Sequence, residues 1–118
     1  MGYESLRVYQ EGYKLAMEVH SVSQGFPQHE RYELGSQLRR AAVSIALNIA
    51  EGYGRQDADG EFQHFLRNAI GSCNEVLVLL DMVYDLGYLD TEQHKRLKES
   101  YTILGKQMYR LREKRIQS

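Results

Sequence analysis

Residues 40–55, RAAVSIALNIAEGYGR, form a long apolar run with polar interruptions that ends in a Gly-x-Gly. Within it, Ala41, Ile45 and Ile49 stand four positions apart. Residues at this spacing share one face of an α-helix, so the stretch predicts a helix with a buried side. The same period extends toward the N-terminus and predicts a helix over about residues 31–53.

The other parts of the chain share this helical period, and no stretch alternates as a β-strand does. The sequence predicts helices at about residues 4–22, 31–53, 60–86 and 91–115. Long helices joined by short connections are typical of an antiparallel up-down bundle. We therefore expect residues 1–118 to form a single all-α domain, a four-helix bundle that assembles into a closed homo-oligomer.

Turn and cap residues mark the expected helix ends. Pro27 can open a short turn before the second helix. The expected caps of the last two helices are Asp57 or Asp59 at the start of the third, Gly87 in the left-handed conformation at its end, and Asp90 with Gln93 at the start of the fourth.

Composition restricts the class of protein. Hydrophobic residues make up 42% of the chain and charged residues 26%, as in ordinary globular proteins. No apolar stretch reaches the roughly 18 residues of a membrane span, and the N-terminus does not resemble an export signal. A single cysteine, Cys73, excludes an internal disulfide and an all-cysteine metal site. We expect a cytoplasmic protein without membrane association, cofactor or small-molecule substrate.

The first three helices are apolar on more than one side. On the first, the residues expected to face the core are Leu6, Tyr9, Tyr13, Ala16, Met17 and His20. A monomeric bundle of this size cannot cover the second sides, and large exposed apolar patches mark interaction sites. We therefore predict an obligate homo-oligomer with the 91–115 helix mostly outside. The second sides give the predicted interface residues: Val8, Leu15, Val19, Val43, Ala46, Leu47, Ala50, Leu79 and Met82.

A polar stripe separates the two apolar sides of the 31–53 helix. One interpretation is a small enzyme or metal-binding bundle in which Glu51 and Glu75 act with neighbouring arginines. The other is a structural hydrogen-bond network, which bundles use to set register. We favour the network. The stripe and its expected partners on the next helix are Arg40, Ser44, Asn48, Glu51, Arg55, Ser72 and Glu75.

Motifs for catalysis or metal binding are weak. The Gly-x-Gly at 52–54 closes a helix, whereas a nucleotide-binding turn opens a helix after a strand. Glu61 and His64 resemble half of a di-iron site, but the sequence has no second Glu-x-x-His. Cys73 is expected on the inward face as an inert core residue. We expect no metal site, no catalytic residues and no enzymatic activity.

The C-terminal helix is basic although the whole chain has a net charge of −1. Residues 91–118 hold eight Lys and Arg against three Glu, a net of +5. A basic patch repeated in an oligomer raises the affinity for phosphates. One interpretation is an ordinary solvated charged face. The other, which gives the candidate partner, is a contact with RNA or with an enzyme that acts on nucleic acid. The candidate contacts are Lys106, Arg110, Arg112, Lys114 and Arg115.

Several segments resemble one protein family. The most specific is residues 44–52 (SIALNIAEG), with residues 26–30 (FPQHE) before it and residues 69–75 (AIGSCNE) after it. They are similar to four-helix bundle proteins encoded within intervening sequences of bacterial 23S ribosomal RNA genes, or elsewhere in bacterial chromosomes. The resemblance covers nearly the whole chain.

This resemblance implies an up-down bundle that assembles into a closed homopentamer, and it implies no catalytic activity. More distantly, the chain is similar to the accessory variability protein of diversity-generating retroelements. That similar protein is a strongly basic pentamer that binds nucleic acid and a reverse transcriptase. The present chain departs from it in being near neutral.

Overall fold

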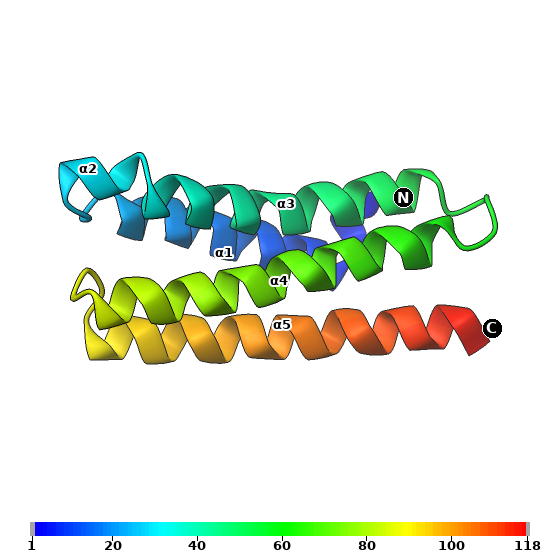
Figure 1. The fold of residues 1–118 in the computed structure, drawn as a ribbon. Coiled ribbons are helices and arrows are strands. Elements are labelled where there is room, and N and C mark those ends of the chain that lie inside the picture. Colours follow the sequence, from blue (N-terminus) through cyan, green and yellow to red (C-terminus); the bar gives the residue numbers. More distant parts are fainter. Residues whose placement is uncertain (1, 118) are drawn as a thin grey trace.

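The computed structural model describes the backbone of residues 2–117 and the side chains of residues 2–114. Its long helices run side by side and antiparallel in one elongated body of 45 × 22 × 20 Å (Figure 1). The prediction of an all-α four-helix bundle is confirmed. The elements are η1 (Tyr3–Ser5), α1 (Arg7–Ser23), α2 (Gln28–Arg31), α3 (Leu34–Gly54), α4 (Glu61–Asp85) and α5 (Thr91–Gln117).

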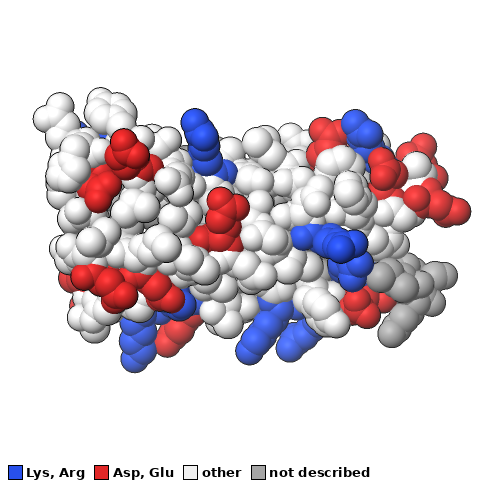
Figure 2. Space-filling model, viewed as in Figure 1, with Lys and Arg blue, Asp and Glu red and all other residues white. Residues whose placement is uncertain are grey.

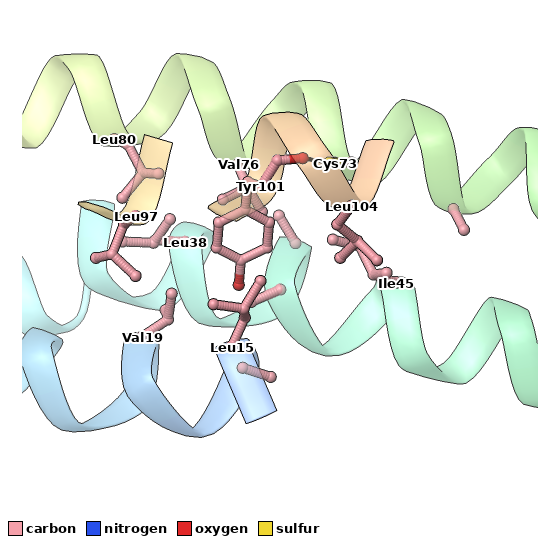
Figure 3. Close-up of a cluster of buried hydrophobic side chains, with 14 of the residues drawn as sticks. Leu15, Val19, Leu38, Ile45, Cys73, Val76, Leu80, Leu97, Tyr101 and Leu104 are labelled. Atoms are coloured by element: carbon pink, nitrogen blue, oxygen red, sulfur yellow. Dashed lines mark hydrogen bonds between the residues drawn. The ribbon is translucent and has the colours of Figure 1, made fainter. Parts of the chain in front are cut away.

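Each long helix packs against two neighbours. Helix α1 contacts α3 and α5, and α4 contacts the same two helices, so α1 and α4 stand at diagonal corners of the bundle. Buried side chains recur three or four positions apart on each helix, so the helical period of the sequence becomes one continuous core. Figure 3 shows this core, with Leu15, Val19, Leu38, Ile45, Cys73, Val76, Leu80, Leu97, Tyr101 and Leu104 drawn together.

Helix α1 turns a different side inward from the one expected. Ala16 is buried as predicted, but Tyr13 and Met17 are 53% and 50% exposed, and His20 is also exposed. Both sides of α1 are apolar, so hydropathy did not distinguish them. On α1, aliphatic side chains fill the core, whereas Tyr13 lies at the surface, where its hydroxyl group can contact water. Gly12 also favours the observed side, because it brings the α1 backbone close to Ile45.

The observed rotation of α1 changes the predicted interface. Val8, Leu15, Val19 and Leu79 are at most 6% exposed and pack inside the chain's own core. The prediction that these residues face another copy is therefore wrong. Ala46 is also covered and Ala50 is half-buried. The remaining predicted interface residues, Val43, Leu47 and Met82, are exposed.

The helix ends follow local sequence signals in most places. Gly87 has φ 84°, and the Tyr88 amide donates a 2.9 Å hydrogen bond to the Val83 carbonyl, which closes α4 as predicted. At the start of α5, the Asp90 carboxylate accepts a 2.7 Å hydrogen bond from the backbone N–H of Gln93. This contact confirms the predicted cap.

The start of α4 differs from the expectation. The prediction that Asp57 or Asp59 caps this helix is wrong, because Gly60 occupies the N-cap position with φ 76°. No side chain caps the helix there. A positive φ favours glycine over aspartate, so the sharp turn of the connection decides which residue precedes the helix.

Helices α3 and α4 approach closely at Gly52. A Cβ atom added to Gly52 would lie 2.7 Å from the Phe65 Cβ and 3.1 Å from the Phe62 Cδ1. Real Cβ atoms do not approach a neighbour so closely, so a side chain at position 52 would push the two helices apart. Gly52 therefore has a packing role that the Gly-x-Gly pattern alone did not indicate.

We predict that Gly52→Ala lowers the free energy of unfolding by about 1–3 kcal/mol, because the added methyl group overpacks the contact with Phe65. Urea unfolding monitored by circular dichroism measures the change. Gly54→Ala is the matched control, since no heavy atom of the described side chains lies within 4 Å of a Cβ at that position. The control should leave stability unchanged or raise it by up to about 1 kcal/mol. Equal losses in both variants would contradict the packing role.

Candidate functional site

The polar stripe of α3 ties α3 to α4 near the middle of the bundle. The Ser44 and Ser72 hydroxyl oxygens lie 2.9 Å apart. The Asn48 side-chain amide donates to the Ser44 carbonyl at 2.8 Å and to the Ser44 Oγ at 3.0 Å. All three side chains are half-buried. The structure therefore brings these three predicted residues together as a helix-to-helix hydrogen-bond group.

Glu51 and Arg55 belong to a separate, exposed group. The Arg55 Nε donates to Glu51 at 2.8 Å, and Arg55 also lies 3.6 Å from Glu61 across the connection. The hydrogen bond to Glu51 raises the pKa of Arg55 further. Arg55 also stands 5.4 Å above the Phe65 ring. This arrangement holds the end of α3 against the start of α4.

The sequence predicted that the stripe residues form one buried hydrogen-bond network. The described residues do not form such a network. Arg40 and Glu75 are exposed, and neither hydrogen-bonds to the other stripe residues within the described part of the chain. Among the described residues, no three His, Cys, Asp or Glu side chains gather closely enough to hold a metal ion. The stripe thus consists of two small groups with different neighbours.

An apolar surface opens beside the stripe, between α1 and α3. We call its four exposed side chains Tyr13, Met17, Val43 and Leu47 the α1–α3 patch; Leu47 is 63% exposed. A groove of about 220 Å³ runs along this patch. Ala46 and Ala50 line the groove, and their small size leaves room for a partner side chain.

A second apolar surface lies on α4. Val78, Met82 and Leu86 stand four positions apart and are all about half exposed. We call them the α4 stripe. The α4 stripe and the α1–α3 patch share no helix. One chain therefore exposes two distinct apolar surfaces.

The basic residues of α5 are divided between internal ion pairs and free charges. Figure 2 shows Lys and Arg interspersed with Asp and Glu along the edge where α5 runs, and several Asp and Glu around the turn between α3 and α4. Arg112 is paired with Glu113 at 3.2 Å. Lys106, Arg110 and Lys114 are exposed and have no described ion-pair partner. The side chain of Arg115 lies outside the described residues.

Sequence reasoning missed a cluster that joins α4 to α5. The Asp81 carboxylate lies 2.8 Å from the His94 Nε2 and accepts a 3.0 Å hydrogen bond from the Lys98 ammonium. The His94 ring stacks on Tyr84 with centroids 4.1 Å apart. The 94/98 spacing places the His94 and Lys98 side chains on one face of α5, but their partner on α4 depends on how the helices are rotated.

Cys73 behaves as the sequence predicted. Its side chain is buried, and the thiol donates a 3.1 Å hydrogen bond to the Tyr101 carbonyl. Burial raises the pKa of Cys73 to about 11, so the thiolate is scarce near neutral pH. This environment is that of an inert core cysteine.

Comparison with known protein families places the chain in one of them. A family model described as 23S rRNA-intervening sequence protein matches residues 4–110. The matched segment includes all of α1 to α4 and most of α5. No curated protein matches the chain. None of the described helices is both long and apolar enough to cross a membrane.

We predict that Asp81→Asn destabilises the protein at pH 7 by less than about 1 kcal/mol, because the carboxylate is half exposed. Hydrogen bonds from His94, then Lys98, lower the pKa of Asp81. A lowered pKa stabilises the fold above the usual carboxyl pKa of about 3.9. The difference from wild type should therefore vanish as the pH falls through the lowered value.

Urea unfolding at a series of pH values measures this difference. Asp85→Asn is the charge-matched control, because Asp85 is exposed at the C-terminus of α4, where a negative charge is unfavourable. It should not destabilise the protein. A destabilisation by Asp81→Asn that persists unchanged in acid would contradict the electrostatic explanation.

Proposed function

This chain belongs to the 23S rRNA-intervening sequence protein family, and we propose that it is a non-enzymatic assembly protein that binds RNA. In this proposal, copies of the chain join into a closed homo-oligomer and hold RNA on the basic side of α5. The observation that carries the proposal is the exposure of the α1–α3 patch and the α4 stripe on one chain.

Two different apolar surfaces suit a ring. If the α1–α3 patch of one copy packs on the α4 stripe of the next, every copy uses both surfaces, and the contact is head-to-tail. Such contacts generate closed rings when the rotation between neighbours closes. The family resemblance implies five copies, so we propose a pentamer.

The surroundings of the α1–α3 patch support its use as an interface. Polar side chains flank the apolar centre, with Arg40, Asn48 and Glu51 lining the surface next to Val43 and Leu47. An apolar centre with a polar rim is the usual composition of a protein interface. Arg40, which has no described partner in its own chain, would then find one across the contact.

Helix α5 contributes nothing to either apolar surface, so the proposed contact leaves its basic side uncovered. Lys106, Arg110 and Lys114 follow one another at four-residue spacing and would recur once per subunit around a ring. Repeated cationic sites raise the affinity for a polyanion through simultaneous contacts. RNA binding by the assembly is therefore compatible with a chain whose net charge is only −1.

We predict that the wild-type protein has about five times the mass of the 13.7 kDa chain in light scattering after size-exclusion chromatography. Leu47→Glu and Met82→Glu should each prevent ring closure, because each places a charge in one apolar contact. Ile103→Glu is the matched control, since Ile103 is an exposed apolar residue of α5 outside both surfaces. The control should keep the wild-type mass.

Mixing the two disrupted variants tests the head-to-tail geometry. Leu47→Glu keeps its α4 stripe and Met82→Glu keeps its α1–α3 patch, so the mixture should give a heterodimer that grows no further. A mixture that stays monomeric, or a wild-type protein of monomer mass, would contradict the proposed assembly.

For RNA, we predict binding at low salt that weakens as salt rises, with a log–log slope of about −0.7 per phosphate contact for a single strand. Fluorescence anisotropy with a labelled RNA at several salt concentrations measures this slope. Lack of binding at low salt, or binding that does not change with salt, would contradict contacts between α5 and phosphates.

A further inference from the structure

A groove between α4 and α5 opens on the basic side of α5. It has a volume of about 330 Å³, and its lining includes Ile70, Asn74 and Leu77 from α4 and Gly105, Lys106 and Tyr109 from α5. We infer that this groove holds an unstacked base of single-stranded RNA. The inference rests on the proposed RNA binding and deepens it, because it specifies which form of RNA is bound.

The shape of the groove depends on Gly105. This residue has no side chain, and a Cβ atom there would lie 3.5 Å from the Cys73 sulfur. Cys73 therefore forms part of the groove floor although it is buried under the surrounding side chains. The floor of the resulting slot is mostly apolar. Such a floor suits the flat face of a nucleobase.

Tyr109 provides the stacking surface. Its side chain is 55% exposed at the groove edge, and the structure places no other aromatic ring within stacking distance among the described residues. Bases of single strands stack on exposed tyrosine rings without regard to sequence. Asn74 and Thr102 also line the groove and can hydrogen-bond to the edge of a base held there.

The charge at the groove selects a nucleotide over a neutral ligand. Lys106 and Arg110 stand on either side of Tyr109 along α5, and both are exposed without a described ion-pair partner. Among the residues whose side chains the structure describes, no carboxylate lines the groove. A base on Tyr109 would therefore have its phosphates beside two cations. In a duplex the bases remain paired and stacked, so only a single strand can offer one to the slot.

The test compares a labelled single strand of about 15 nucleotides with a duplex of the same length by fluorescence anisotropy at low salt. Tyr109→Ala should weaken binding of the single strand by about five- to a hundredfold and leave binding of the duplex unchanged. Tyr109→Phe should bind as wild type, since the ring remains. Ile103→Ala is the matched control, because Ile103 is equally exposed on α5 at 56% but lies outside the groove.

A second pair of variants separates the groove from general charge. Lys106→Gln should weaken single-strand binding more than Lys95→Gln, which removes an equal charge from α5 away from the groove. Chromatography and thermal unfolding should show that all variants keep the wild-type mass and fold.

The outcomes distinguish the two proposals. If Tyr109→Ala and Ile103→Ala bind the single strand equally well, or if the duplex binds as tightly as the single strand, the stacking inference is wrong while RNA binding by α5 stands. If the wild-type protein binds neither RNA, both proposals fall. If an acidic peptide displaces the single strand as efficiently as unlabelled RNA does, the groove recognises acidic chains rather than bases, and the inference is overturned.

Discussion

The close contact between α3 and α4 is the constraint on which the rest of the structure depends. Gly52 meets Phe62 and Phe65 at one end of the pair, and Ser44 reaches Ser72 nearer the middle. These contacts fix the rotation of α3 about its axis. Because α3 is apolar on two sides, burying one side against α4 and α1 necessarily leaves Val43 and Leu47 at the surface. The exposed α1–α3 patch is thus a consequence of core packing.

Local features of the fold could be predicted from the sequence, whereas the rotations of helices could not. The glycine at 87 and the Asp90 cap depend on a few neighbouring residues, and both were predicted. Which side of α1 faces inward depends on competition between two apolar sides, and the rings of Tyr9 and Tyr13 make the less buried side look apolar although their hydroxyl groups are polar. Only the packing of α1 against α3 and α5 shows which side of α1 faces inward.

The candidate site was predictable to a similar degree. Ser44, Asn48 and Ser72 meet as expected, because residues near the middle of two packed helices meet over a range of rotations. Arg40 and Glu75 do not join them, and the Asp81–His94 contact was not foreseen. These pairings require the relative rotation of two helices that are distant in sequence. The same applies to the groove at Tyr109, which is lined by residues of both α4 and α5, with Gly105 opposite Cys73.

Tyr101 places a polar hydroxyl group inside the hydrophobic core. Its ring is fully buried, and its hydroxyl points toward the side of the core formed by Leu15 (Figure 3). That oxygen has no hydrogen-bond partner among the described residues, and burial raises the pKa of the phenol. A buried hydroxyl without a partner costs about 1–3 kcal/mol. Tyr101 therefore fills the centre of the bundle with a large ring, while its hydroxyl oxygen makes no hydrogen bond to any described residue.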